Sequence, residues 1–420
     1  MLTPPRMDTL LRRMHTRREL PPTAGLPLEL GDYALKPALH FAAGLALWPG
    51  LPEPIPACSG TAALVVALQA LRRRAPARTA VIVPAYTCPL VPLAIRLLPD
   101  LRAVACDTLP GSGDFDPEKL DALCGKDTLA VVPTHLGGRV ADVATASAIA
   151  ARHGAFVIED AAQALGAFAE NGQSVGLRGD AGFFSLAAGK GLTTYEGGLL
   201  VSRDAALRAE LAATAEKTLR PDLFRSLRRN LELLGYGLFY NPPGLRLTYG
   251  RKLRKHLDEG DEIRAVGDAF SLADIPLHSL DALRRRVAAK ALERLPAFLA
   301  AGRERAGQRR ERLAELGTVS VISDRAGVDG IWPFFMLLMP GTAQRDKALH
   351  ALWRAGLGVS KLFARALPDY AFLHPVFSGN TSSGCPNARD LADRMLTVSN
   401  THWLDDATFD AIIRKLEQCL

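Results

Sequence analysis

The chain has 420 residues, of which 48% are hydrophobic and 23% charged, a composition typical of a folded globular protein large enough for two domains. No apolar run approaches the roughly 20 residues of a membrane span, and the first twenty residues lack the apolar stretch of a secretory signal. We therefore expect a cytoplasmic protein. The six cysteines form no CxxC pair and no metal-binding spacing, which favours reduced thiols and no metal site.

From residue 57 to about 205, short apolar runs alternate with stretches of helical spacing. The expected helices are 59–74, 91–99, 114–124, 143–154 and 161–167, and the expected strands are 80–86, 101–107, 128–135 and 155–160. This alternation predicts a mainly parallel sheet with helices on both faces. Ligands bind at the carboxyl ends of such strands, where Ser59, Tyr86, His135 and Asp160 would converge.

Beyond residue 205 the alternation stops. Residues 206–265 interleave proline, tyrosine and arginine without a regular pattern, whereas 278–316 predicts one long helix. A smaller α/β unit follows, with strands expected at 332–340 and 395–400 and helices at 345–356 and 405–418. We therefore expect an N-terminal segment (1–40), a large domain (41–214), a basic insertion (215–265) and a long helix with a C-terminal small domain (266–420).

The net charge of +7 comes from one segment. Residues 217–256 contain ten lysines and arginines against two acidic residues, so the rest of the chain is close to neutral. A general nucleic-acid-binding surface is therefore not indicated. Three interpretations of this segment remain: a solvated insertion, a peripheral contact with an anionic membrane surface, or a site whose arginines bind the diphosphate of a nucleotide-linked sugar.

The stretch FFSLAAGKGLTTYEGGLLVS (183–202) places Lys190 in a glycine-rich loop between two apolar runs. Held in a dry pocket, a lysine becomes an amine nucleophile. A pyridine aldehyde cofactor needs such an amine, a carboxylate for its ring nitrogen and a phosphate cradle. Asp160 offers the carboxylate, and the helix start at Ser59-Gly60-Thr61, together with Ser185, offers the cradle.

These residues lie in sequence blocks that resemble the DegT/StrS-type sugar aminotransferases. The blocks are CSGTAALVVAL, VIVPAYTCPLVPLAI, DFDPEKLDAL, VVPTHLGGRVADV, VIEDAAQALGA, GDAGFFSLAAGKGLTTYEGG and CPNARDLADRMLTVSNTHWLDD, in the family's order. The resemblance implies the α/β fold of type I PLP-dependent transferases: a large domain with a mainly parallel seven-stranded sheet and a smaller C-terminal α/β domain. It also implies pyridoxal 5'-phosphate (PLP) as cofactor and a homodimer.

By this resemblance, Lys190 would form the Schiff base with PLP and shuttle a proton, and Asp160 would pair with the ring nitrogen. Gln163 would face the cofactor's phenolic oxygen. The residues that would hold the phosphate are Gly60, Thr61 and Ser185. His135 and Glu196 match positions near the substrate.

The sequence departs from the family in three places. Cys88 stands where an aromatic residue usually contacts the cofactor ring, so either Tyr86 or Cys88 would fill that role. Tyr195 stands where a glycine is common. The asparagine that usually reaches the neighbouring subunit's phosphate has no clear counterpart in AVGDAFSLADIPLHSL.

Each of these residues also has a structural interpretation. Lys190 alone would be a solvated loop lysine, and Asp160 and Thr61 are plausible helix caps. His135 is equally compatible with a hydrogen-bonded core histidine, and Cys88 with packing.

The resemblance implies an aminotransferase that moves an amino group from glutamate or glutamine onto a keto-sugar, nucleotide-linked, in surface polysaccharide or secondary-metabolite biosynthesis. Lys190 argues against the family's dehydratase branch, for which we expect histidine. Two alternatives stay open. One is an aminotransferase acting on a cyclitol or another non-nucleotide ketone. The other is a catalytically silent PLP-fold protein that acts as a regulator or scaffold.

Overall fold

The computed structural model describes residues 18–34, 50–377 and 384–420. The prediction of no secretory signal falls on residues 1–17, which lie outside the described residues, as does part of the predicted N-terminal segment. No helix among the described residues is both long and apolar enough to cross a membrane.

Seven strands form the larger sheet, in the order β1-β7-β6-β5-β4-β2-β3. Their bounds are β1 Ile55–Ala57, β2 Ala80–Pro84, β3 Arg102–Cys106, β4 Thr128–Val131, β5 Phe156–Asp160, β6 Ala181–Ser185 and β7 Gly198–Val201. Neighbours from β3 to β6 pair in parallel, whereas β7 is antiparallel to both β6 and β1. The predicted mainly parallel α/β sheet is confirmed.

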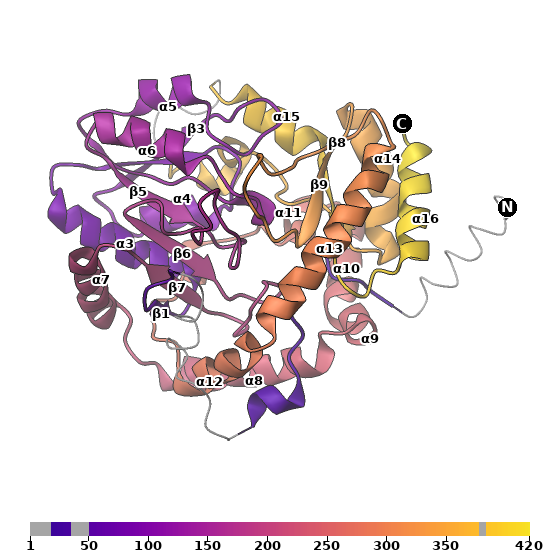
Figure 1. Cartoon of the computed structure of the whole chain (residues 1–420), viewed down its shortest axis with the longest axis horizontal. Helices are drawn as coiled ribbons and strands as arrows, with labels where there is room; N and C mark the ends of the chain where they lie inside the picture. Colours follow the sequence, from indigo (N-terminus) through magenta and orange to yellow (C-terminus); the bar gives the residue numbers. More distant parts are fainter. Residues whose placement is uncertain (1–17, 35–49, 378–383) are drawn as a thin grey trace, which may run out of the picture.

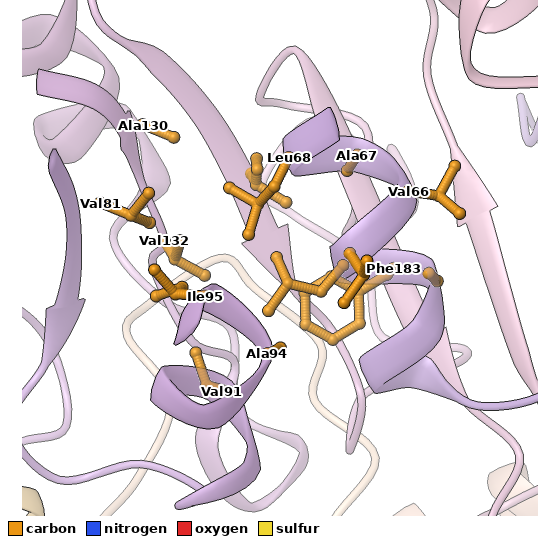
Figure 2. Packing of buried hydrophobic residues seen from close by; sticks show 14 of the residues in the cluster. Val66, Ala67, Leu68, Val81, Val91, Ala94, Ile95, Ala130, Val132 and Phe183 are labelled. Carbon is orange, nitrogen blue, oxygen red and sulfur yellow. The ribbon is translucent and has the colours of Figure 1, made fainter. Parts of the chain in front are cut away.

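Helices that follow the strands cover this sheet (Figure 1). They are α3 Gly60–Arg74, α4 Leu90–Arg96, α5 Pro117–Leu123, α6 Val143–Arg152 and α7 Ala205–Thr218. Four of these helices have an N-cap side chain that accepts a hydrogen bond from a backbone N–H of the first turn. The capping residues are Ser59, Asp116, Asp142 and Asp204. The apolar faces of α3 and α4 pack on Val81, Val132 and Phe183 of the sheet layer (Figure 2).

The helix predicted over 161–167 is wrong, because this segment is a series of turns. The Asp160 carboxylate accepts a hydrogen bond from the Ala162 N–H at 3.0 Å, which closes a turn. Gly166 then has φ 95°, a left-handed conformation that no helix continues through. The strand therefore ends in a loop that lies directly at the edge of the sheet.

The smaller sheet is antiparallel, in the order β10-β11-β9-β8. Its strands are β8 Ser320–Val321, β9 Phe334–Leu338, β10 Val359–Ser360 and β11 Met395–Ser399. The helices beside it are α14 Thr342–Leu352, α15 Pro386–Arg394 and α16 Asp406–Glu417. The long helix predicted over 278–316 is two helices, α12 Ala282–Leu292 and α13 Leu295–Ala314. They separate where Pro296, which has no N–H, interrupts the hydrogen-bond ladder.

Residues 206–265 are mostly helical, in contrast to the irregular segment that the sequence predicts. After α7 come α8 Leu223–Phe239, α9 Pro242–Leu245, the π-helical turn η3 Arg246–Gly250, α10 Arg251–Asp258 and α11 Glu262–Val266. Asp222, Asn241 and Asp261 cap α8, α9 and α11. The short 3-10 turns are η1 Leu30–Tyr33, η2 Leu136–Gly138, η4 Leu272–Asp274, η5 Trp353–Ala355, η6 Leu367–Asp369 and η7 Ala371–Leu373.

The extended segment 18–29 connects the parts of the chain around Lys190. Glu19 N–H donates to Pro242 O, and Leu20 N–H donates to Gly356 O of the small domain. Ala24 N–H donates to Pro333 O, and Leu26 N–H donates to Gly191 O in the lysine loop. This segment therefore holds both sheets and the 206–265 helices against one loop.

Candidate active site

The carboxyl ends of β4, β5 and β6 meet at one edge of the larger sheet. Thr134 and Asp160 form a parallel bridge just past β4 and β5, and His135 N–H donates to Asp160 O at 2.9 Å. Ala161 N–H donates to Phe183 O of β6 at 2.9 Å. The sheet thus places Asp160 beside β6 and the loop that contains Lys190.

Asp160 is a buried carboxyl with few hydrogen-bond donors. Within the described part of the chain, its side chain accepts one hydrogen bond, from Ala162 N–H. Burial raises the pKa of Asp160 to about 6, against the opposing effects of that N–H and of the Lys190 charge. A cationic N–H donor placed against this carboxyl would restore it to the ionised form, which is what a protonated pyridine nitrogen offers.

Lys190 lies in the loop between β6 and β7. The loop closes through Leu186 N–H to Gly197 O at 2.7 Å and Ala188 N–H to Tyr195 O at 2.9 Å, and Gly189 turns it with φ 79°. Burial lowers the pKa of Lys190, while the negative charge of the Asp160 carboxylate opposes this shift. A lowered pKa increases the fraction of neutral, nucleophilic amine.

The start of α3 lies against β6 and β7. A Cβ on Gly60 would be 3.2 Å from the Ser185 Cβ, and one on Gly198 would be 2.5 Å from the Gly60 nitrogen. The Ser59 hydroxyl accepts from Ala62 N–H, whereas the N–H groups of Gly60 and Thr61 donate to no acceptor in the described chain. Two free helix N-terminal amides beside a serine hydroxyl suit a phosphate group.

A cavity of about 140 Å³ opens beside the Lys190 loop. Gln163 and Lys190 line it from the large domain. Gln163 accepts a hydrogen bond from Gly137 N–H through its Oε1 at 2.8 Å, and its amide NH₂ donates to no group in the described chain. This NH₂ is therefore available to a bound oxygen.

The opposite wall of the cavity contains residues that no sequence motif indicates. Ser360, Lys361 and Thr397 come from the smaller sheet, and Tyr249 and Val266 come from the helices after α8. The Lys361 side chain is only 5% exposed, and its Nζ donates to Glu262 at 2.7 Å. Burial lowers the pKa of Lys361, and Glu262 opposes this shift. A lysine in GVSKLF looks solvated in the sequence, so only the packing of the smaller sheet identifies it.

The sequence allows His135 to be either near the substrate or a hydrogen-bonded core histidine, and its contacts are those of a core histidine. Its Nδ1 accepts from Ala141 N–H at 3.0 Å, so Nε2 carries the hydrogen and donates to Glu159 at 2.9 Å. Glu159 also accepts from the N–H groups of Gly176 and Gly179. Successive strand residues point to opposite faces, so this buried pair lies across the sheet from the Asp160 carboxyl.

Glu196 is tied to the neighbouring helices. Arg229 of α8 binds its carboxylate with two N–H groups, at 2.6 and 3.1 Å, and His278 lies 3.6 Å away. Arg284 of α12 donates to the Glu196 carbonyl oxygen at 2.7 Å. Burial raises the pKa of Glu196, but His278 and Arg229 outweigh it and hold the pKa below its ordinary value. Glu196 therefore anchors α8 and α12 to the lysine loop.

Tyr86 and Cys88 differ in where they lie. The Tyr86 hydroxyl accepts from Phe363 N–H at 3.2 Å and donates to Phe363 O at 3.3 Å, so it is fixed in the core under the small domain. Cys88 is half-buried and within electrostatic reach of Asp160 and Lys190. Burial raises the pKa of its thiol to about 12. Cys88 is accordingly the one of the two that faces the reactive groups.

Among residues 18–34, 50–377 and 384–420, two residues other than glycine adopt left-handed backbone conformations, and both adjoin this region. Tyr195 in the lysine loop has φ 65°, and Trp332, next to the cavity residues Ile331 and Pro333, has φ 48°. Such conformations cost about 1–3 kcal/mol and concentrate at functional sites. The value at Tyr195 also gives a physical reason for a glycine at this position in similar sequences.

Comparison with known proteins is consistent with this arrangement. The L-glutamine:2-deoxy-scyllo-inosose aminotransferase of Streptomyces fradiae is 39% identical over 171 residues, which are 40% of this chain and 39% of that protein. The chain thus matches about two fifths of the length of such curated relatives.

Two solved structures share the fold. One is DesI in the presence of its TDP-sugar product, with a TM-score of 0.70, 21% identity and coverage of 96% of this chain and 93% of that one. The other is the putative sugar aminotransferase Spr1654 from Streptococcus pneumoniae in its PLP form, with a TM-score of 0.68, 16% identity and coverage of 100% and 96%.

The model of the DegT/DnrJ/EryC1/StrS aminotransferase family matches residues 36–237 and 279–417. The stretch 238–278 between the two matches contains α9, η3, α10 and α11 and supplies Tyr249 and Val266 to the cavity. It also contains most of AVGDAFSLADIPLHSL, the block without the expected asparagine. With most of its length matched, the chain belongs to the DegT/DnrJ/EryC1/StrS aminotransferase family.

Proposed function

We propose that this protein is a PLP-dependent aminotransferase that moves an amino group from glutamate or glutamine onto a keto-sugar. One observation carries the proposal: a lysine with a lowered pKa and a buried carboxyl with a raised pKa interact in one site. The free N–H groups at the start of α3 lie against Ser185 of β6, the strand that leads into the lysine loop. A structural loop lysine would have none of these partners.

The residues fit PLP group by group. When bound, PLP supplies an aldehyde carbon and a pyridinium ring that withdraws electrons. The Asp160 carboxylate would accept the hydrogen of the ring nitrogen, and Gln163 would donate its free amide N–H to the phenolic oxygen. Gly60, Thr61 and Ser185 would bind the phosphate. Cys88 would contact the ring in place of an aromatic side chain.

Lys190 would have two tasks. Its amine would hold the cofactor through the aldehyde that PLP supplies, and during transfer it would take a proton from the substrate and return it. Holding the cofactor and taking the proton require the neutral amine, which burial of Lys190 favours, whereas returning the proton uses the protonated form. The segment 18–29 is bound to the lysine loop through Leu26 N–H and Gly191 O, and its Pro22 and Thr23 line the cavity beside Lys190, where they would help to exclude water.

A second acceptor class, a cyclitol, is favoured by the size of the cavity. Pockets for drug-sized ligands measure roughly 300–1,000 Å³, whereas the space beside Lys190 is about 140 Å³, with Tyr249 and Val266 among its walls. A relative's printed name also refers to a cyclitol ketone, 2-deoxy-scyllo-inosose. A compact ring ketone would fit beside Ser360, Lys361 and Thr397.

The test is amino transfer by the PLP-loaded protein, measured as 2-oxo acid released from glutamate or glutamine. We expect release with either a nucleotide-linked keto-hexose or a keto-cyclitol as acceptor, and the preferred acceptor identifies the class. If the loaded protein transfers no amino group from any donor, the enzymatic proposal fails and the silent-fold alternative stands.

We further infer that the protein works in the cytoplasm as a homodimer. Support comes from family membership and from the described chain, which contains no membrane-crossing helix. Light scattering during size-exclusion chromatography would measure the mass directly. A mass near 90 kDa, twice the 45.1 kDa of the chain, supports a dimer, and a mass equal to one chain contradicts it.

A further inference from the structure

Helix α8 exposes its apolar face to solvent. Leu223 is 87% exposed, Phe224 79%, and Leu238 64%. The other exposed members of this face, which we call the α8 stripe, are Leu227, Leu231 and Leu234. The spacing of 223, 227, 231, 234 and 238 places these leucines on one side of the helix. Large side chains exposed along a whole helix indicate a surface that contacts something else.

The opposite side of α8 holds the helix to the protein. Leu233 and Tyr236 are buried there, Tyr33 donates to Leu233 O at 2.8 Å, and Arg229 binds Glu196. The core-facing side of α8 is therefore already in contact with the protein, and the α8 stripe is a second, separate apolar surface. In Figure 1, α8 runs along the lower edge of the molecule with α12, away from α5 and α6.

Positive charge lies at the start of the α8 stripe and along one of its edges. Lys217 and Arg220, in the residues just before α8, are exposed and form no ion pair within the described chain. Arg225 and Arg228 follow one edge of the stripe, each paired with an acidic residue at 3.3 and 3.2 Å. Leucine and phenylalanine beside unpaired cations are the side chains of a helix that lies in a membrane interface.

We propose that α8 is a peripheral membrane-binding helix, with the α8 stripe in the acyl-chain boundary and the surrounding cations on anionic lipid headgroups. This surface does not depend on the proposed transamination, because none of its stripe residues lines the cavity beside Lys190. The proposal also separates these cations from substrate binding, since Lys217 and Arg220 do not line that cavity either.

Charge decides between a membrane and a second copy of the chain. A two-fold interface centred on the α8 stripe brings the same patch of both copies face to face, so the unpaired Lys217 and Arg220 of the two copies would lie close together. Like charges oppose such an approach. An anionic lipid surface instead attracts each lysine or arginine that lies near it.

The test is co-sedimentation of the purified full-length protein with lipid vesicles. We expect binding to vesicles of equal phosphatidylcholine and phosphatidylglycerol, several-fold weaker binding to pure phosphatidylcholine, and a decrease as salt screens the cations. The variant Leu227→Glu/Leu231→Glu should bind at least tenfold more weakly. Lys217→Glu/Arg220→Glu should lose the preference for phosphatidylglycerol.

Leu123→Glu is the matched control, since Leu123 is an exposed leucine on α5 and should leave vesicle binding unchanged. Far-UV circular dichroism and the amount of bound PLP should be the same in all variants, because each changed side chain is exposed. The proposal is overturned if the wild-type chain does not sediment with phosphatidylglycerol vesicles. It is also overturned if Leu227→Glu/Leu231→Glu binds vesicles as tightly as wild type. A third contrary result is a dimeric wild type that does not bind vesicles and becomes a monomer in Leu227→Glu/Leu231→Glu, because the α8 stripe would then be an interface between two copies.

Discussion

Glu159 and Asp160 are consecutive acidic residues at the end of β5, and both are buried, yet their pKa values shift in opposite directions. Glu159 accepts hydrogen bonds from His135, Gly176 and Gly179, which outweigh burial and lower its pKa. Asp160 has one donor, Ala162, and burial raises its pKa to about 6. One carboxyl is therefore satisfied by the fold, while the other is left for a ligand.

Asp160 should make the stability of the cofactor-free protein depend on pH. From pH 4 to 6 the folded chain holds a proton that the unfolded chain has released, so the free energy of unfolding falls as pH rises. A shift of two pKa units corresponds to roughly 3 kcal/mol. Asp160→Asn lacks this titration. The free energy of unfolding of the variant, relative to that of wild type, should therefore be higher at pH 7 than at pH 4 by about that amount. Urea unfolding at both pH values measures it, and a pH-independent difference contradicts the assignment.

Glu159→Gln should destabilise the fold without removing the cofactor site. The amide places an NH₂ where a carboxylate accepts four hydrogen bonds, which we expect to cost about 3 kcal/mol. Urea unfolding checks this cost, with Glu118→Gln on the exposed face of α5 as the control. A cost no greater than that of the control would mean that the buried network contributes little.

At the scale of elements, the close contact of α3 with β7 determines the proposed phosphate cradle. Gly198→Ala would place a Cβ 2.3 Å from the Ser59 carbonyl oxygen, so strand and helix must separate. We expect a loss of about 1–3 kcal/mol in stability and weaker PLP binding. Gly307→Ala on α13 meets nothing within 4 Å and should instead stabilise by about 0.5–1 kcal/mol. Thermal unfolding with and without PLP separates the two, and equal effects would contradict the packing argument.

The sequence predicts the elements of the larger sheet well and the 206–265 helices poorly. Strands such as β5 have continuous apolar runs, and caps such as Asp116 mark helix starts, so local signals suffice there. The turn after Asp160 depends on a bond from Ala162 N–H, which competes with a helix-compatible sequence. In α8, Gly235 and Gly237 weaken the helical signal, and the helix forms because Leu233 and Tyr236 are buried against the protein.

At the scale of the whole molecule, the cavity beside Lys190 is built from segments far apart in the chain. Gln163 and Lys190 come from blocks that the sequence identifies, whereas Tyr249, Ser360 and Lys361 come from the 238–278 stretch and the smaller sheet. No local pattern predicts that these segments meet, because their contact depends on how the two sheets pack. The proposed cofactor chemistry is therefore visible in the sequence, but the residues that would select the substrate are not.

The most direct test of the proposed function is the visible absorbance of the purified protein supplied with PLP, recorded before and after glutamate, alongside Lys190→Ala and Lys361→Ala. Lys361 is the matched control because it is the other lysine that lines the same cavity. We predict a band in wild type that glutamate bleaches, the same band before glutamate in Lys361→Ala, and no such band in Lys190→Ala. A wild-type protein that stays colourless with PLP, or a Lys190→Ala protein with the same band, would contradict the assignment of Lys190 as the residue that binds PLP.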